Sequence, residues 1–318
     1  MEKIVWIFGR SLLRGLCVAG SVASLCFVVV HFMPGDVALE IAMARYGESD
    51  IRITEMADRV REEEGLSLSL RLQYLNWVAR VASLDFGISL VDGRPVLPTV
   101  GGALRFSAIL GVAALAISLC VALPVGIVCG LFPGGKFNFV MAICSSLIIS
   151  VPAFVWGIVL VVVFALKLRY LPVAGFASPA HIVLPATTIA LTLFAPSSRI
   201  IAVSLSETIE SPYCAFARHK GLNEFCVLLL HGFRNASVPV VTYVGMQTAS
   251  LFGGAMAVES LFNWPGVGSL FLRSVTTRDI PVLQAAGIAM GLIYVTVNTA
   301  VDLLCLYLRP TVRLERLG

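Results

Sequence analysis

The sequence predicts an all-α integral membrane protein with six transmembrane helices, and composition is the first reason. Hydrophobic residues make up 58% of the 318-residue chain and charged residues 13%, whereas soluble domains average about 45–50% and about 25%. The mean hydropathy is +0.91. Six stretches of 21 to 30 residues contain no Asp, Glu, Lys or Arg, and about 20 apolar residues cross the hydrocarbon core. A soluble enzyme, a disordered regulator and a secreted disulfide scaffold are all excluded by this composition.

Each uncharged stretch predicts one spanning helix. Pro124 and Pro152 lie inside two of the stretches and predict kinks, which membrane helices tolerate. The first stretch is interpreted as a retained helix, with a cleaved signal peptide as the alternative, because no Ala-x-Ala site follows it. We expect the helices near residues 11–32, 106–131, 139–166, 180–198, 236–258 and 282–308.

Lysine and arginine in the short connections predict that both termini lie in the cytoplasm. With the N-terminus inside, 11 Lys and Arg residues fall on the inner side and 4 in the short outer loops, as the positive-inside rule requires. The expected organisation has three parts: an N-terminal segment with the first helix, 1–33, an extracytoplasmic segment, 34–105, and a five-helix core, 106–318. The core contains a cytoplasmic loop at 199–237.

The extracytoplasmic segment is expected to contain two helices. Arg52 to Glu64 has helical character, and Leu68 to Val81 has the spacing of an amphipathic helix. Two interpretations of the segment remain open, a solvated cap packed on the membrane domain and a docking surface for an external partner. The expected apolar face of the second helix consists of Leu68, Leu72, Leu75, Val78 and Ala79.

The cytoplasmic loop predicts a helix, a glycine break and a second short helix. Ser211 can cap a helix that begins at Pro212, and Gly221 supplies a left-handed stop. Asn223 can cap the second helix, whose apolar face would contain Phe225, Leu228 and Leu229. The pair is interpreted either as an interfacial amphipathic hairpin or as a docking element for a soluble partner.

Patterns typical of enzymes and metal sites are weak in this chain. Gly130-x-x-x-x-Gly135-Lys136 matches most of a phosphate-binding loop, but it lies between two expected spans and Phe137 follows the lysine, so it predicts a tight turn. HExxH and GxSxG do not occur. The eight cysteines form no C-x-x-C pair and the four histidines show no paired ligand spacing, so no metal site is expected.

One acidic residue falls within the last expected span. Asp302 needs a polar partner at that depth, and Asn298 lies four residues earlier on the same helical face. We expect a structural hydrogen bond between them, or snorkelling to the inner surface, with a proton relay as the alternative.

Short motifs throughout the chain resemble those of permeases in ATP-binding-cassette importers, specifically the dipeptide, oligopeptide and nickel branch. The matching motifs are Met33-Pro34-Gly35-Asp36, Asp85-Phe86-Gly87-x-Ser89, Arg94-Pro95-Val96, Leu171-Pro172, Ala217-Arg218-x-Lys220-Gly221-Leu222-Asn223, Arg234-Asn235-Ala236-Ser237-x-Pro239, Gly253-Gly254, Glu259-x-x-Phe262-x-Trp264-Pro265-Gly266-x-Gly268 and Arg278-Asp279-x-Pro281-Val282-x-Gln284. Their order and the six-span background make the resemblance specific. The general pattern of importer permeases has an acidic residue six positions before the loop glycine, where this chain has Ala215. This departure suits the peptide and nickel branch.

The resemblance implies a role for two regions. The cytoplasmic loop would be the coupling loop, known as the EAA loop, that sits in a groove of an ATPase subunit, and the region after the fifth helix would shape an outer gate. The implied coupling residues are Ala215, Phe216, Ala217, Arg218, Lys220, Gly221, Leu222 and Asn223, and the implied gate residues are Glu259, Phe262, Trp264, Pro265 and Gly266. Phe262 and Trp264 are expected to anchor the gate at the membrane interface.

The resemblance also implies the assembly. Two such permeases would pair in a bacterial inner membrane, with two ATPase subunits inside and a substrate-binding protein outside, and transport would proceed by alternating access. This chain would bind no nucleic acid and no cofactor, since ATP and Mg are used by the ATPases. The motifs lie closest to nickel-type permeases, so nickel or a metal chelate is the expected cargo and a di- or oligopeptide the alternative. The rival classes are an autonomous secondary transporter or channel and a membrane enzyme.

Overall fold

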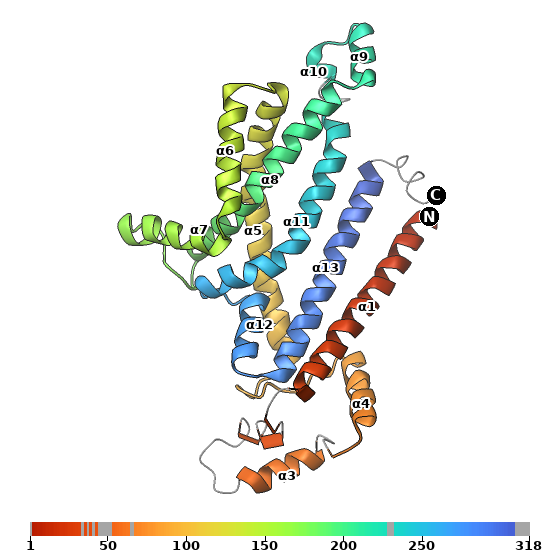
Figure 1. Cartoon of the computed structure of the whole chain (residues 1–318), viewed down its shortest axis with the longest axis vertical. Helices are drawn as coiled ribbons and strands as arrows, with labels where there is room; N and C mark the ends of the chain where they lie inside the picture. The colour runs from red at the N-terminus through yellow and green to blue at the C-terminus, as the bar shows by residue number, and fades with distance from the viewer. Residues whose placement is uncertain are drawn as a thin grey trace. The chain divides into compact units, whose positions relative to one another are not determined.

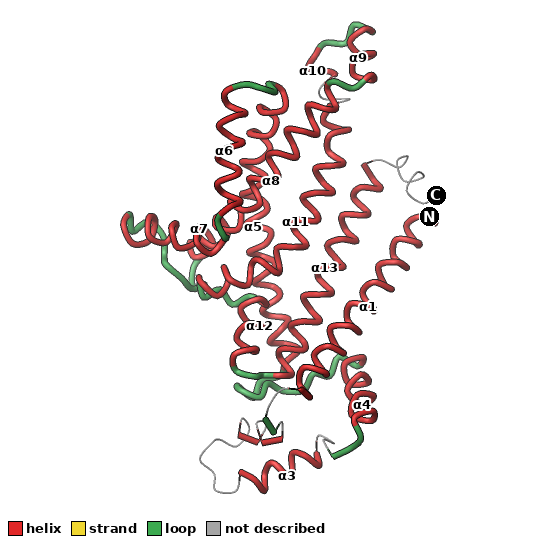
Figure 2. Tube along the Cα trace, in the orientation of Figure 1, coloured by secondary structure: helices red, strands yellow, loops and turns green. Residues whose placement is uncertain are grey.

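The computed structural model describes residues 2–32, 35–36, 38–39, 42–43, 53–63, 67–227 and 232–308. These residues are helical almost throughout, and no strand occurs among them (Figures 1 and 2). The helices are α1 (Glu2–Phe32), α3 (Ile53–Glu63), α4 (Leu70–Ala82), α5 (Val96–Leu131), α6 (Lys136–Ser150), α7 (Ala153–Leu160) with a π-helical continuation (Val161–Lys167), a 3-10 turn (Pro179–Ile182), α8 (Val183–Ile209), α9 (Pro212–His219), α10 (Glu224–Val227), α11 (Arg234–Leu261), α12 (Val267–Thr276) and α13 (Ile280–Leu308).

Three helical stretches in the described ranges are long and apolar enough to cross a membrane. They are Val96–Leu131, Pro179–Ile209 and Ile280–Tyr307, and α6 with the α7 segment makes a fourth if that bent pair is one span. The all-helical membrane fold is therefore confirmed. The count of six spans and the cytoplasmic position of both termini stay predictions.

The chain folds as two compact units. Unit 1 contains residues 1–11, 108–264 and 294–318, and unit 2 contains residues 12–107 and 265–293. These units are defined by contacts within the protein. The segments expected from the sequence, with boundaries at 33 and 105, are defined by position relative to the membrane, so that division stays a prediction.

In unit 1, α8 is the central helix. It packs against α11, α6 and α7, and it also meets α5 at unusually close range. A Cβ atom added to Gly126 would lie 2.6 Å from the Cβ of Ile201, and one added to Gly130 would lie 2.8 Å from the carbonyl oxygen of Ala202. Small residues allow such close backbone approach between membrane helices. A further proline, Pro196, lies inside α8.

The prediction of one continuous helix at 139–166 is wrong. The chain bends by 101° between α6 and the α7 segment. Val151 has extended backbone angles, with φ −108° and ψ 130°, because the ring of Pro152 disfavours helical geometry in the residue before it. The kink expected at Pro152 is thus confirmed, and it is a break between two helices.

Two helix ends also differ from the expectation. α8 continues to Ile209, eleven residues past the expected end at residue 198, and α5 begins at Val96, ten residues before the expected start. The segment between α8 and α11 is therefore shorter than the loop predicted at 199–237, because the first residues of that loop belong to α8 and the last to α11.

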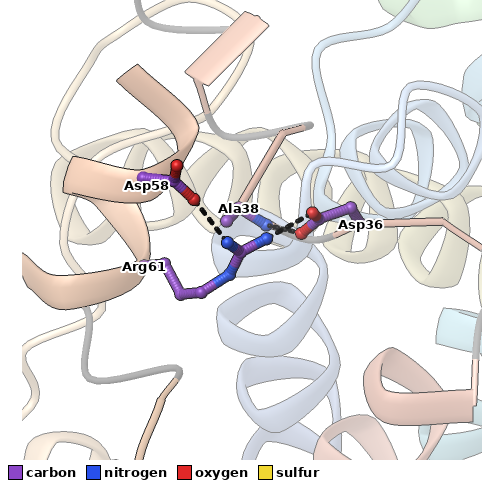
Figure 3. Close-up of polar contacts among 4 residues, drawn as sticks. All are labelled: Asp36, Ala38, Asp58 and Arg61. Carbon is purple, nitrogen blue, oxygen red and sulfur yellow. Dashed lines mark hydrogen bonds and ion pairs between the residues drawn. The ribbon is translucent and has the colours of Figure 1, made fainter. Parts of the chain in front are cut away.

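In unit 2, the two helices expected in the extracytoplasmic segment are confirmed as α3 and α4. α3 packs Ala57 and Val60 against Ala38, Ala42 and Leu90. Figure 3 shows the guanidinium group of Arg61, on α3, between the carboxylates of Asp58 and Asp36. Each of its two ion pairs has an N–O distance of 2.5 Å.

α4 packs through two aromatic residues, and much of its expected apolar face is exposed. Tyr74 and Trp77 make its contacts with the rest of unit 2, whereas Leu72, Leu75 and Val78 are exposed. The hydroxyl groups of Tyr74 and Ser24 lie 2.7 Å apart, and the Trp77 indole donates to Gln284 Oε1 at 3.0 Å. The aromatic rings and their polar tips therefore decide how α4 packs.

The close contact between α5 and α8 yields a stability prediction. Gly126→Ala is expected to lower the thermal unfolding midpoint of the purified protein, because the new methyl group overlaps Ile201 and a backbone oxygen, and overpacking costs about 1–3 kcal/mol. Gly111→Ala, on the same helix, is the control, since no atom lies within 4 Å of its added Cβ. Equal midpoints for the two variants would contradict the prediction.

Candidate functional site

The predicted helix, glycine break and helix are confirmed in the loop at 199–237, which the sequence predicts to be cytoplasmic. α9 ends at His219, and Gly221 has φ +82°. The Gly221 amide donates to the Arg218 carbonyl at 2.9 Å, and the Leu222 amide donates to the Ala217 carbonyl at 3.3 Å. This pair of bonds is the Schellman arrangement that closes a helix at a left-handed residue. The chain then enters α10, with the Val227 amide bonded to the Asn223 carbonyl at 3.0 Å.

A small apolar cluster holds α9 and α10 together. Cys214, Ala217 and Val227 are buried against one another. A guanidinium N–H of Arg218 donates to the Ile209 carbonyl at 3.2 Å and so ties α9 to the last turn of α8. Both short helices lie at one end of α8 and α11 (Figure 1). α9 is thus a fixed extension of the helix bundle of unit 1.

α9 and the turn after it expose apolar side chains to the solvent. The Phe216 side chain is 61% exposed, and Tyr213 and Leu222 are exposed as well. The Lys220 ammonium lies 4.7 Å from the Phe216 ring centroid, a cation–π arrangement. Of the predicted coupling residues, Ala215, Phe216, Ala217 and Arg218 belong to α9, and Lys220, Gly221, Leu222 and Asn223 form the turn after it.

Two local expectations in this loop had different outcomes. Ser211 occupies the N-cap position of α9 but makes no side-chain cap bond, because its hydroxyl instead donates to the Thr208 carbonyl at 2.5 Å. The apolar face expected from Phe225, Leu228 and Leu229 lies outside the described side chains.

The predicted outer element begins in the last turn of α11, which contains Glu259, and continues past the end of that helix. Glu259 is 1% exposed and Trp264 is 5% exposed. The Trp264 amide donates to the Glu259 carbonyl at 2.8 Å, and the Gly175 amide donates to the Phe262 carbonyl at 2.8 Å. Pro265 and Gly266 then lead into α12, whose first residue is Val267.

The expectation that Phe262 and Trp264 anchor this element at the membrane interface is wrong. Both side chains are buried in the protein. α7 makes room for Phe262 at Gly157, where an added Cβ would lie 2.7 Å from Leu261 and 3.2 Å from the Phe262 ring. The aromatic rings therefore serve packing between α7, α8 and the end of α11.

Sequence reasoning missed a buried polar contact in unit 2. The Asp279 carboxylate is buried. One oxygen accepts from the Ser89 hydroxyl at 2.5 Å, and the other accepts from the Leu90 amide at 3.2 Å. Both residues stand in motifs that the sequence offered, but 190 positions separate them. The contact fastens the 85–95 loop to the turn before α13.

The remaining candidates are only partly resolved by the structure. The Asn298 amide group donates to the Tyr294 carbonyl at 3.0 Å. Asp302 lies one turn further along α13, half-buried, and a bond between the two stays a prediction. The phosphate-loop-like segment is a tight turn, as expected, with Gly134 at φ +84° and Gly135 preceding α6. Within the described residues, no group of three His, Cys, Asp or Glu side chains is arranged to hold a metal ion.

A cavity of about 610 Å³ lies in unit 1 between α5, α8, α11 and α13. Its lining is almost wholly aliphatic, with Leu119, Ile201, Val241 and Val301 from the four helices. A charged solute would lose its hydration there without gaining hydrogen bonds. The cavity is therefore unsuited to a polar solute.

Comparison with known proteins gives consistent matches. A family model described as "Binding-protein-dependent transport system inner membrane component" matches residues 122–314. "Glutathione transport system permease protein GsiC" of Escherichia coli K12 is 34% identical over 295 residues, which are 92% of this chain and 94% of that protein. The protein of the same name from Pectobacterium atrosepticum is 35% identical over 294 residues, 91% and 92% of the two chains.

A solved structure also shares the fold. It is described as "Crystal structure of an amino acid ABC transporter with histidines", with a TM-score of 0.52 and 14% identity, over 65% of this chain and 92% of the solved one. At that identity the match supports the fold alone.

The buried carboxylate yields a second prediction. Asp279→Ala is expected to speed amide hydrogen exchange at Leu90, because that buried amide loses its acceptor, at a cost of about 1–3 kcal/mol, whereas the Ser89 hydroxyl keeps Asp92 Oδ1 as a partner. Asp85→Ala is the control, since Asp85 accepts only an exposed bond from the Gly87 amide. Unchanged exchange in the Asp279 variant would show that the contact does not hold the loop.

Proposed function

Because the chain belongs to the family of binding-protein-dependent transport system inner membrane components, we propose that it is the permease subunit of an ATP-driven importer of short peptides. Membership makes it a membrane component of a transport system and not an enzyme. In such systems ATP hydrolysis typically belongs to separate ATPase subunits. The single observation that carries the proposal is the 34% identity, over 92% of the chain, to a permease named for the transport of glutathione, which is a tripeptide.

The proposed assembly follows the topology expected from the sequence. Six spans with both termini in the cytoplasm pair with those of a second permease, and the path for the solute lies between the two chains. The aliphatic lining of the 610 Å³ cavity in unit 1 supports a path between the chains. A polar peptide would lose its hydration in that cavity without gaining hydrogen bonds. Transport by alternating access opens the path to the outside and the inside in turn.

We propose that α9 and the turn after it couple this path to ATP hydrolysis. The support is physical: the element is fixed to α8 through Arg218 and to α10 through a buried cluster, and it presents Phe216 to the solvent. An exposed aromatic side chain on a rigid helix suits insertion into a groove of an ATPase subunit. The outer element around Glu259 and Trp264 is proposed to border the outer gate, where a substrate-binding protein delivers the solute.

The cargo is proposed to be a short peptide of the size of glutathione. The two relatives described above are named as glutathione permeases. This favours the peptide alternative over the nickel or metal chelate expected from the motifs, and nothing in the comparisons supports nickel.

An uptake experiment tests the cargo. Cells with the gene are expected to accumulate labelled glutathione or labelled dipeptide faster than cells without it, and labelled nickel, with or without a metallophore, equally in both. Gene-dependent nickel uptake that excess peptide does not reduce would overturn the peptide assignment. Peptide uptake that persists without the partner ATPases would instead indicate an autonomous transporter.

A substitution in the loop tests coupling. Gly221→Val is expected to abolish most transport-coupled ATPase activity, because a left-handed backbone costs an L-residue about 1–2 kcal/mol and a β-branched one suffers most. Gly221→Asn is the matched control, since asparagine tolerates this conformation. No atom lies within 4 Å of an added Cβ, so the backbone angle alone separates the two variants. Full coupling in an intact complex with valine would contradict the prediction.

A further inference from the structure

The exposed face of α4 is the strongest unexplained feature of unit 2. Leu72 and Leu75 lie on the side of the helix away from Tyr74 and Trp77, and Val78, one turn after Tyr74, lies at the border of that side. All three are exposed, Leu75 at 61%. Ala79 and Ala82 lie on the same side, so the stripe is apolar over three turns. A helix in water would not expose such a stripe, because burying a leucine side chain is worth about 1.5–3 kcal/mol.

The contacts of Tyr74 and Trp77 place α4 at a defined depth along the proposed membrane helices α1 and α13. Trp77 bonds to Gln284, which follows Asp279 by five residues, and Gln284 lies inside the candidate membrane span of α13. Five helical residues span about 7 Å. Tyr74 meets Ser24 of α1, within a stretch that carries no charge from residue 15 to residue 35. α4 is therefore packed on the apolar parts of two helices, just inside one end of each.

The two helices that support α4 lie side by side within unit 2. A Cβ added to Gly291 of α13 would lie 2.6 Å from Val18 of α1, and one added to Gly287 would lie 3.3 Å from Val22. Ser24 and Phe27 follow these contacts along α1, and Gln284 precedes Gly287 along α13. α4 thus packs on a continuous surface made by α1 and α13.

Aromatic residues cluster where α4 packs on α1 and α13. The rings of Phe27, Tyr74 and Trp77 lie with centroids 5.2 to 6.1 Å apart. Tyrosine and tryptophan are typical of the level where the hydrocarbon core meets the headgroups. The exposed Arg71 lies one turn before Leu75 on the same side of α4, where a guanidinium group can reach lipid phosphates.

We propose that α4 is an interfacial membrane helix and that its leucine stripe, Leu72, Leu75, Val78, Ala79 and Ala82, inserts among the acyl chains of phospholipids in the outer leaflet. Interfacial helices bury their apolar face about 5–10 Å into the headgroup and acyl boundary, which matches the depth set by Gln284. The proposal rests on the membrane topology proposed above. It assigns to lipid an apolar face that the sequence analysis left without a partner.

A photoreactive residue at position 75 tests the proposal in the assembled transporter in its native membrane. With p-benzoylphenylalanine at Leu75, illumination is expected to add the mass of one phospholipid to this chain. The matched control is the same label at Asn76, which is exposed on the polar side of α4 and is expected to give several-fold less lipid adduct. A crosslink from position 75 to a second permease or to a binding protein, or no lipid adduct above that of position 76, would overturn the proposal.

A second measurement covers the case in which the labelled chain does not accumulate. Leu75→Trp is expected to add fluorescence that lipids brominated on their acyl chains quench strongly, whereas the added fluorescence of Asn76→Trp is quenched several-fold less. Equal quenching would overturn the proposal. Neither measurement depends on the cargo, so a failed peptide uptake and a failed lipid contact are separate results.

Discussion

Close approach of helix backbones at glycine positions is the constraint on which unit 1 depends. Gly126 and Gly130 set the distance between α5 and α8, Gly157 admits Phe262 beside α7, and an added Cβ at Gly245 of α11 would overlap Val301 of α13 at 2.1 Å. Inside a bilayer the hydrophobic effect does not drive helices together, so van der Waals contact at short range must do so. The position of α8, and with it that of α9 at its end, follows from these contacts.

The distribution of charge along the chain did not predict where the helices end. Arg199 marked the end of the fourth uncharged stretch, but α8 continues to Ile209 because a helix needs no apolar residues once it leaves the hydrocarbon core. The same reasoning explains the early start of α5 at Val96. Conversely, the charge-free stretch from 137 to 166 holds a 101° break, because Pro152 acts on the backbone and not on hydropathy.

The candidate site was predictable where one residue imposes its own conformation. Gly221 indicated a left-handed stop from sequence, and the backbone adopts it. Predictions failed where a side chain had two choices: the Ser211 hydroxyl bonds back to Thr208 and not forward to α9. The contact between Ser89 and Asp279 joins residues 190 positions apart, and a single sequence carries no signal for such pairing. For α4, amphipathicity identified the apolar face correctly but did not identify the apolar medium that it meets.

Pro196 lies at the middle of α8. It cannot donate a hydrogen bond to the carbonyl of Thr192, so the helix bends more readily there than on either side. The half from Pro196 to Ile209 is about 20 Å long and carries α9, whereas the half before it holds Thr188 against Gly157 of α7. Bending at Pro196 would therefore displace α9 without disturbing the contact between α8 and α7.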